Sequence, residues 1–330
     1  MKTYILIDFS NLFFRMKHTS MKGATLDERL GMVMHQMFNG ISKVWKKFDA
    51  NHCIFAMEGK SWRKKVYPEY KRNRKLANMK KTEAELELDE QFFMAANSFT
   101  EFLQNHTGVS VIKADDAEAD DVIATFIFDR PNDKHIIIST DSDFHQLLAE
   151  NVTIYDPMKA HYIDMSGVYD DYMKPVIDKK TGKHKTIGDP EYVLFKKCIR
   201  GDSSDNIKSA YPRIREKSTK NCIGIDKAFE DRNAKSFEWN TVMLHEWEDH
   251  KQQMHLVKDD YFRNKMLIDL REIPNNVRDQ IRVAIDLEVT KETSIRDLLF
   301  RFMKFCHKWG LVRISENHEY YIDFLRKRYE

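Results

Sequence analysis

Short apolar runs and amphipathic stretches alternate along the first half of the chain. Residues 27–47 predict a helix, because apolar side chains recur from Leu30 to Phe48 at the 3.6-residue spacing of one helix face. Four apolar runs predict buried strands, at Tyr4–Asp8, Cys53–Met57, Val109–Ile112 and Ile136–Ser139. The last two lead into predicted helices at about 117–128 and 144–148. We therefore expect an α/β fold with a mainly parallel central sheet flanked by helices on both faces.

The segment between the second and third predicted strands has a different pattern. A basic run at 71–75 is followed by Thr82 and Glu85, a capping-box pattern that predicts a helix to about Gln104. A long basic excursion that returns on a helix favours an arch or lid, here at about 60–104. An ordinary solvated surface loop is the alternative.

Strand signals fade after Gly188, where the pattern becomes mainly helical. Helices are predicted at Pro190–Arg200 and Ser294–Trp309, the second with an N-cap pattern at Ser294 and Asp297 and a stop at Gly310. The 179–183 turn is expected to close a surface hairpin. Since 330 residues suit about two domains at ~150 residues each, we expect a first domain at 1–190, which contains the sheet and the arch, and a helical domain at 191–330.

Charge is balanced along the whole chain but segregated within it. The 54 Lys and Arg residues nearly cancel the 52 Asp and Glu residues. Residues 60–81 nevertheless carry ten basic residues against one acid, and residues 196–220 carry eight against three. A solvated face is the usual interpretation of such runs. Two basic stretches beside an acidic cluster instead favour a polyanionic partner that approaches bound cations.

The cysteines and the apolar runs exclude several classes of protein. The four cysteines lack a CxxC pattern or zinc-type histidine spacing, so we expect reduced, buried thiols in a cytoplasmic protein. The N-terminal apolar run is interrupted by Asp8 and predicts a strand rather than a signal peptide. No apolar run approaches the ~18 residues of a membrane span.

Acidic residues follow predicted strands or helices at four places. They are Asp8; Glu118, Asp120 and Asp121; Asp141 and Asp143; and Asp202 and Asp205. In a parallel sheet these groups would meet at one edge, and two carboxylates ~4 Å apart repel by ~4 kcal/mol at an effective dielectric of 20. Such an all-oxygen cluster suits two or more Mg²⁺ ions, with Mn²⁺ as a substitute. The alternative is that acids in first helical turns only stabilise those helices.

Five motifs together resemble flap-endonuclease-type 5′-nucleases, and most closely the bacteriophage branch and its ribonuclease H members. They are DFSNL at 8–12, YPEYKRNR at 67–74, EADD at 118–121, STDSD at 139–143 and GDSSDN at 201–206. The segment Met266–Leu270 and the IPNN run at 273–276 resemble the C-terminal part of the same branch. The resemblance implies the PIN-like 5′-nuclease fold and Mg²⁺-dependent 5′→3′ exonuclease and flap endonuclease action on RNA or DNA, as in the removal of RNA primers during phage DNA replication.

The resemblance also assigns residue roles. It implies that all eight acids bind metal ions by a two-metal mechanism, and that Tyr70, Lys71 and Arg74 lie in an arch near the scissile phosphate. The acid that the family usually has at the end of the second strand is missing here, so we include Glu58 as a candidate outer ligand. The segment after Asp205 is expected to form a helix–hairpin–helix-like element that grips duplex backbone.

The remaining expectations concern nucleic acid and partners. The expected DNA-binding residues are basic, namely Lys71, Arg72, Arg74, Lys75, Lys208, Arg213, Arg215, Lys217 and Lys227. The hairpin of many relatives is Gly-rich and binds K⁺, whereas the corresponding segment here has only Gly224. We still include K⁺, in this hairpin, as a second expected cofactor. The expected substrate is nucleic acid, as a 5′ flap, nicked or RNA-primed duplex, and the expected protein partners are a single-strand-binding protein and a sliding clamp. We expect a monomer without membrane contact. If the chain is phage-encoded, its expected location is the host cytoplasm. A PIN-type ribonuclease and a non-catalytic structure-specific DNA-binding protein are the alternatives.

Overall fold

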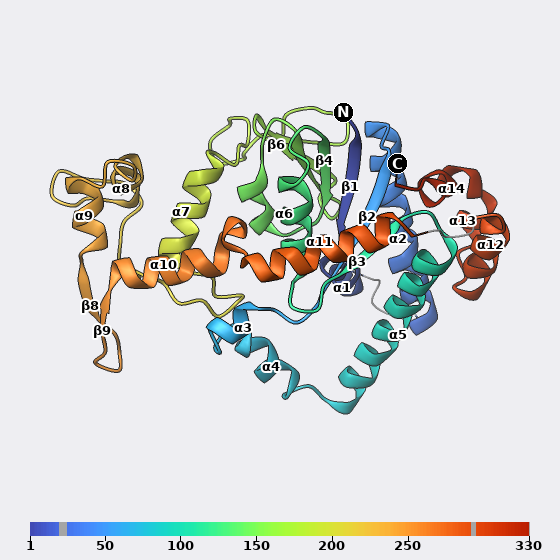
Figure 1. Ribbon diagram of the computed structural model, residues 1–330, viewed down its shortest axis with the longest axis horizontal. Helices are drawn as coiled ribbons and strands as arrows, with labels where there is room; N and C mark the ends of the chain where they lie inside the picture. The colour runs from blue at the N-terminus through green and yellow to red at the C-terminus, as the bar shows by residue number, and fades with distance from the viewer. Residues whose placement is uncertain (20–24, 292–294, 330) are drawn as a thin grey trace. The chain divides into compact units, whose positions relative to one another are not determined.

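The computed structural model describes residues 1–19, 25–291 and 295–329, which form two compact units (Figure 1). The sheet unit consists of Met1–Ser61, Lys81–Thr186 and Asn275–Glu330, and the helical unit consists of Trp62–Lys80 and Ile187–Pro274. None of the helices formed by the described residues combines the length and apolar character needed to cross a membrane.

The sheet unit is built on a mixed sheet with the strand order β3-β2-β1-β4-β5-β6-β7. The first five strands in chain order are parallel, and β6 and β7 are antiparallel additions at one edge. The strands are β1 (Thr3–Asp8), β2 (His52–Met57), β3 (Ser110–Lys113), β4 (Lys134–Ile138), β5 (Val152–Asp156), β6 (His161–Asp164) and β7 (Gly167–Tyr169). The four predicted strands and their parallel order are confirmed, while β5 to β7 were not predicted.

Helices cover both faces of this sheet, as expected. The helices of the unit are α1 (Phe9–Thr19), α2 (Leu26–Phe48), α5 (Glu83–His106), α6 (Ala119–Phe128), α11 (Asn275–Val289), α12 (Leu298–Lys308), α13 (Val312–Glu316) and α14 (His318–Arg326). On one face, Tyr4 packs edge-on against Phe126 of α6, with ring centroids 5.1 Å apart. On the other face, Ile5 and Ile7 join the main core, which residues of α1, α2, α5, α12 and α14 fill.

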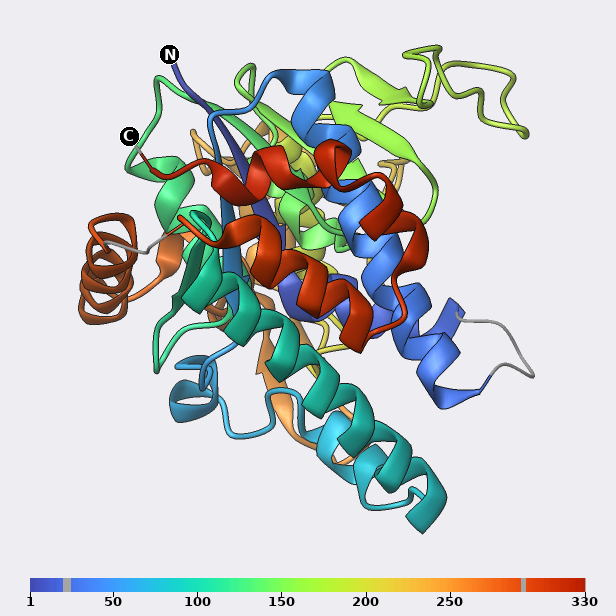
Figure 2. The same cartoon turned by 90° about the vertical axis from the view of Figure 1, so that its right-hand side faces the viewer.

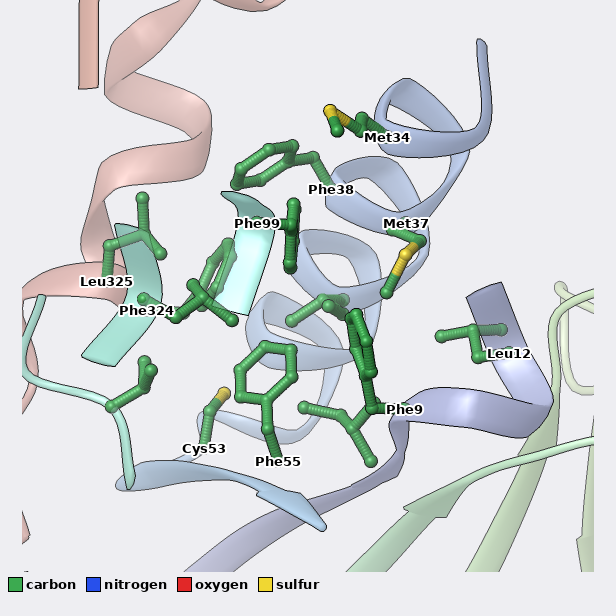
Figure 3. Packing of buried hydrophobic residues seen from close by; sticks show 14 of the residues in the cluster. Phe9, Leu12, Met34, Met37, Phe38, Cys53, Phe55, Phe99, Phe324 and Leu325 are labelled. Carbon is green, nitrogen blue, oxygen red and sulfur yellow. The ribbon is translucent and has the colours of Figure 1, made fainter. Parts of the chain in front are cut away.

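The main core is rich in phenylalanine. Figure 3 shows Phe9, Phe38, Phe55 and Phe99 packed together with Phe324 of the C-terminal helices. Figure 2 shows those helices, in red, alongside α2 and α5, in agreement with the contacts of α14 with α2 and of α12 with α5. The last described helices of the chain therefore complete the core of the sheet unit.

Local capping explains where the two long helices of the unit begin. In α5, the amide N–H of Glu85 donates to the Thr82 hydroxyl oxygen, 3.3 Å, and the Glu85 carboxylate accepts from the Thr82 amide, 2.8 Å. This is the capping box that the sequence predicted. In α2, Thr25 and Glu28 form the same arrangement. After α12, Gly310 adopts a positive φ of 63° at the expected stop; Asp297 is the N-cap residue, and Ser294 lies outside the described residues.

The helical unit has its own smaller core. Its elements are α3 (Arg63–Val66), α4 (Arg72–Asn78), α7 (Pro190–Arg200), α8 (Ile225–Glu230), α9 (Phe237–Met243), the hairpin β8 (Glu246–Glu248) and β9 (Met254–Leu256), α10 (Val257–Ile268) and the 3-10 turn η2 (Leu270–Glu272). Phe195 of α7 packs on Trp239 and Tyr261, with ring centroids 6.0 and 5.5 Å away. The helix at 190–200 is confirmed, whereas the β8–β9 hairpin was not predicted.

The two units interleave along the chain, which differs from the single boundary expected near residue 190. One division does fall close to that point, after Thr186. However, Asn275–Glu330 returns to the sheet unit, because α11 packs on β3 and α6. The expected arch at 60–104 also divides: Trp62–Lys80 belongs to the helical unit, while α5 buries Phe92, Phe99 and Leu103 in the main core.

Candidate metal centre and nucleic-acid interface

Asp8 is buried at the carboxyl end of β1, next to the end of β4. Its carboxylate accepts a hydrogen bond from the amide N–H of Asn11, 3.2 Å, and another from the hydroxyl of Ser139, 3.1 Å. The β1–β4 register, in which Ile7 pairs with Ile138, brings Ser139 to this position. Asn11 in turn accepts from the hydroxyl of Thr140, 2.8 Å, so two neighbouring strand ends are tied together around Asp8.

The pKa of Asp8 reports other negative charges close by. Burial raises this pKa, and the charges of Glu58 and Asp141 raise it further, whereas the hydrogen bonds from Asn11 and Ser139 oppose the shift. The resulting pKa is about 7. Glu58 and Asp141, which follow the two strands adjacent to β1, therefore place negative charge near Asp8 at one edge of the sheet. The metal-binding roles expected of these acids stay predictions.

Glu58 owes its position to a close approach between two backbone segments. After β2, the amide of Gly59 donates to the carbonyl of Ala117, 2.9 Å, and that of Lys60 donates to the carbonyl of Asp115, 2.6 Å. A Cβ atom on Gly59 would lie 2.0 Å from the Ala114 carbonyl oxygen, so only glycine fits there. This pairing brings the end of β2 beside the loop that leads into α6.

The acids that open α6 have a local structural role at the start of that helix. Glu118 is the N-cap residue, and its amide donates to the carboxylate of Asp121, 3.0 Å. The amide of Asp121 donates to the carboxylate of Asp120, 2.9 Å. Glu118 and Asp121 are buried. Each of these two hydrogen bonds engages one oxygen of a carboxylate, so helix stabilisation and ion binding are compatible roles for these side chains.

Asp141 and Asp143 follow β4 at the start of a 3-10 turn, η1 (Ser142–Leu147), which stands where the sequence predicted a short helix at 144–148. Asp141 caps this turn, because its carboxylate accepts from the amide of Asp143, 2.9 Å. The amide of Asp141 donates to the Ser139 hydroxyl oxygen, 3.0 Å. The local hydrogen bonds therefore fix the backbone that carries both acids next to the residues that hold Asp8.

The donor chemistry of the sheet-unit acids suits hard divalent cations. Carboxylate oxygens that repel one another are stabilised by such ions, and Mg²⁺ and Mn²⁺ prefer oxygen ligands. Among the described residues, no three His, Cys, Asp or Glu side chains already stand as a ligand set for one ion. The full set of metal ligands therefore stays a prediction.

Asp202 and Asp205 belong to the helical unit, so the meeting of all eight acids at one edge also stays a prediction.

Asp202 follows the C-cap residue of α7, Gly201. The positive φ of 71° at Gly201 and its close approach to the Ile207 carbonyl require glycine. Burial would raise the pKa of Asp202. The Lys197 ammonium, 2.8 Å away, and hydrogen bonds from Ser204 outweigh it and lower that pKa to about 2.

Asp205 is the point at which the basic segment of the arch meets the loop after α7. Its carboxylate accepts from the Tyr70 hydroxyl, 2.9 Å, and from the Arg74 guanidinium, 2.6 Å, and the Lys71 ammonium lies 3.8 Å away. Lys71 is not within the helix: it precedes α4 with a positive φ of 54°. Lys71 and Arg74 nevertheless converge, because both contact the Asp205 carboxylate.

Two asparagines to which the sequence assigned no role fasten the same junction. The side-chain amide of Asn73 donates to the carbonyls of Ser203 and Ser204, 3.0 and 3.3 Å, and that of Asn206 donates to the carbonyl of Glu69, 2.8 Å. Their positions inside two polar motifs were the only signal for them in the sequence. They hold the backbone that carries Tyr70, Lys71 and Arg74.

The other expected DNA-binding residues lie on the surface of the helical unit. They are exposed, namely Arg72, Lys75, Lys208, Arg213, Arg215, Lys217 and Lys227. Among them, Arg72 pairs with Glu69 and Lys227 with Glu230, both at 2.6 Å. The hairpin expected after Asp205 falls between α7 and α8, where the amide and hydroxyl of Ser218 donate to the Asp226 carboxylate, 2.8 and 2.7 Å. Its helix–hairpin–helix-like character stays a prediction.

The fold and the acidic strand ends define a class of protein, and a comparison of sequences agrees. The chain belongs to the 5′-3′ exonuclease family, because the model of the N-terminal resolvase-like domain of that family matches residues 3–173.

Two of the relatives that match this chain are flap endonucleases. Flap endonuclease Xni of Psychromonas ingrahamii is 29% identical over 167 residues, which cover 49% of this chain and 59% of that protein. The flap endonuclease of Escherichia phage T5 is 28% identical over 211 residues, which cover 63% of this chain and 65% of that protein. The chain thus spans about three fifths of the length of the curated relatives that it matches first.

Solved structures of the phage T5 protein share the fold. The T5 5′-exonuclease with bound zinc ions superposes with a TM-score of 0.59 at 22% identity, covering 87% of this chain and 100% of that one. A complex of the T5 flap endonuclease with DNA and metal ions gives a TM-score of 0.58 at 22% identity, with 87% and 99% covered. The mainly parallel sheet with flanking helices is therefore the fold of this family, as predicted.

Proposed function

We propose that the protein is a divalent-metal-dependent 5′-nuclease that hydrolyses phosphodiester bonds near the 5′ ends of flap, nicked or RNA-primed duplexes. The observation that carries the proposal is the group of acids at adjacent parallel strand ends, in which Glu58 and Asp141 raise the pKa of Asp8. Family membership supports the same reaction class. Removal of RNA primers in phage DNA replication, in the cytoplasm of the host, is the setting that we propose.

The sheet-unit acids would hold Mg²⁺, with Mn²⁺ as a substitute, and Asp202 and Asp205 would complete the ligand set. Two bound ions supply a nucleophilic water and stabilise the leaving oxygen in phosphodiester hydrolysis. The chain itself supplies the fixed carboxylates: Asn11 and Ser139 orient Asp8, and Asp141 is oriented through its own amide and that of Asp143. Glu58 would serve as an outer ligand.

Lys71, Arg74 and Tyr70 would act on the scissile phosphate from the base of the arch. In this structure all three contact Asp205, so they already converge within hydrogen-bonding or ion-pair distance of one anionic group. A phosphodiester is also anionic and accepts the same donors, and cations placed there offset the charge that builds on its oxygens in the transition state. Arg72 and Lys75 would attract the strand.

The helical unit would grip the duplex through its backbone. Lys208, Arg213, Arg215, Lys217 and Lys227 lie on the α7–α8 hairpin and its flanks, where contacts to phosphate position a duplex without reading its sequence. The proposal has three further parts. The hairpin would bind a K⁺ ion, the protein would dock to a single-strand-binding protein or a sliding clamp, and it would act as a monomer.

Cleavage of labelled 5′-flap, nicked and RNA-primed duplexes tests the proposal. We expect products only when Mg²⁺ or Mn²⁺ is present, and their lengths report the balance of flap and exonuclease action. Substrate binding without cleavage at any metal concentration would instead indicate the non-catalytic DNA-binding alternative.

Asp141→Asn provides the matched test of the site. We expect this variant to lose cleavage yet to bind the same duplex at least as well as the wild type, because it removes a ligand charge and also some repulsion toward phosphate. Asp286→Asn, which changes an exposed acid on α11, serves as the control and should keep both properties. A wild-type cleavage rate for Asp141→Asn in Mg²⁺ would show that the site is misassigned.

A further inference from the structure

A pocket of about 780 Å³ opens in the helical unit between the segment after the Asp202–Asn206 loop and the β8–β9 hairpin. Its walls include Lys208, Tyr211 and Arg213 from that segment, and His245, Trp247 and His255 from the hairpin and its start. The nuclease chemistry proposed above uses no part of it except the two cations, Lys208 and Arg213.

The pocket is lined by flat rings held in stacked pairs. The rings of Tyr211 and His245 lie 4.5 Å apart at 29°, and those of Trp247 and His255 lie 4.7 Å apart at 18°. Trp247 is fixed further, because its indole N–H donates to the Ala210 carbonyl, 2.7 Å. The walls therefore present preoriented aromatic surface to whatever enters.

The charges of the pocket favour an anionic ligand. Within the described part of the chain, neither Lys208 nor Arg213 has a carboxylate within ion-pair distance. Two of the acids in the wall are already engaged: Asp260 pairs with Arg263 and accepts from His255, 2.9 Å, and Asp249 accepts from the amides of Lys251 and Gln253, 2.8 and 3.0 Å. The third acid in the wall, Glu248, is exposed. Lys208 and Arg213 are therefore the wall cations left to meet an anionic ligand.

We propose that this pocket binds an unpaired nucleotide of the substrate, with its base against the aromatic walls and its phosphates on Lys208 and Arg213. Bases stack on aromatic side chains irrespective of sequence, and cations beside them neutralise the backbone. An acidic peptide would satisfy the cations but would leave the stacked rings unused. The inference rests on the proposed function, since it assigns a single-stranded part of the nuclease's substrate to a pocket whose lining includes none of the eight acids.

Binding to three labelled duplexes, measured in EDTA so that no strand is cut, tests the proposal. One duplex is blunt, the second carries a short single-stranded extension, and the third carries an abasic extension with the same number of phosphates. Both polarities of extension are compared. We expect the wild type to bind the extension with bases at least fivefold more tightly than the abasic one, because stacking contributes ~1–3 kcal/mol per base.

Variants of the pocket then assign this difference to its walls. Trp247→Ala and Tyr211→Ala should bring the two extensions to equal affinity, while Trp247→Phe, which keeps a ring, should retain most of the difference. Phe237→Ala removes an aromatic side chain that is 72% exposed in the same unit and serves as the matched control. Lys208→Gln with Arg213→Gln should weaken binding of both extensions alike.

Two results would overturn the inference. Equal binding of base-containing and abasic extensions by the wild type would show that only phosphates are held. Loss of the base-dependent difference on addition of a short acidic peptide, but not of adenosine monophosphate, would indicate a peptide site. Cleavage of flap substrates in Mg²⁺ is measured in parallel, so a wild type that cuts but shows no base-dependent difference contradicts this inference alone.

Discussion

His52 is a buried histidine that joins β2 to β3 and to the end of the chain. Its Nδ1 lies 3.1 Å from the Lys327 carbonyl oxygen, which only accepts, so Nδ1 carries the proton. Nε2 then accepts from the Ser110 hydroxyl, 2.9 Å. Burial lowers the pKa of His52 from 6.5 to about 4, although the bond to Lys327 opposes this shift. The neutral ring is thus the form that fits the fold.

A pH-dependent loss of stability follows from this pKa. Between pH 6.5 and about 4 the unfolded chain binds a proton that the folded chain does not. Stability is therefore retained above pH 6.5 and falls as the pH drops toward 4, by ~3 kcal/mol in total. Urea unfolding in EDTA should show a shallower fall for His52→Gln than for the wild type. His307→Gln, at an exposed site, should leave the wild-type slope unchanged; an unchanged slope in His52→Gln would contradict the prediction.

Lys71 allows a second test at the scale of one residue. If its ammonium stabilises the transition state, Lys71→Ala should lower the single-turnover rate at saturating substrate by tenfold or more, ~1.4 kcal/mol per decade. Lys75→Ala removes an exposed cation four residues later and should weaken binding without changing the saturated rate. The same behaviour in Lys71→Ala would mean that Lys71 attracts the strand and has no catalytic role.

At the scale of the element, the expected hairpin between α7 and α8 carries cations on a backbone that hydrogen bonds hold to α8. The amide and hydroxyl of Ser218 donate to the carboxylate of Asp226 in the first turn of α8. A Cβ on Gly224 would lie 2.7 Å from the backbone of Lys217, so the glycine permits this closure. The backbone of Arg215 is also held, because its carbonyl accepts from the amide of Ile225, 3.0 Å. Arg215 and Lys217 therefore stand on a backbone that is fixed to the start of α8.

Neutralising three of these cations should flatten the salt dependence of duplex binding. For B-form DNA, the slope of log affinity against log salt becomes shallower by ~0.9 for each phosphate that Arg213, Arg215 or Lys217 no longer neutralises. Conversion of all three to glutamine should weaken binding to every sequence alike, as measured by titration across a salt series. Lys258→Gln, at an exposed position on α10, is the control. An unchanged slope in the triple variant would exclude duplex binding by this hairpin.

The elements that could be predicted from the sequence are those with strong local signals. Apolar runs indicated β1 to β4, the Thr82–Glu85 capping box indicated the start of α5, and Pro190 marked the start of α7. The β6–β7 and β8–β9 pairs have strands of only three or four residues, too short for a hydrophobic period to register. The link between Tyr70 and Asp205 joins positions 135 residues apart, so no local pattern indicates it.

At the scale of the whole molecule, each unit is assembled from separate stretches of sequence. The sheet unit uses three of them, and the third supplies core side chains. Phe324 is 1% exposed, and its ring centroid lies 6.2 Å from that of Phe38 on α2. Residues almost three hundred positions apart therefore depend on each other for burial.

Truncation of Phe324 tests this dependence. Phe324→Ala should lower the free energy of unfolding by ~3–5 kcal/mol, the usual range for a buried phenylalanine. Phe300→Ala, at a side chain that is 59% exposed on α12, should change it by less than ~0.5 kcal/mol. Urea unfolding of both variants gives the comparison. Equal effects would show that the C-terminal helices add little to the core.

The interleaving also sets an order of events on the ribosome. All residues of the helical unit, which ends at Pro274, are synthesised before Phe324 and Leu325. The helical unit can therefore close its core while the nascent sheet still exposes Phe38, Phe55 and Phe99 to water. Incomplete chains of this kind expose apolar surface during synthesis. We therefore expect chaperones to bind the nascent chain mainly before α14 has been made.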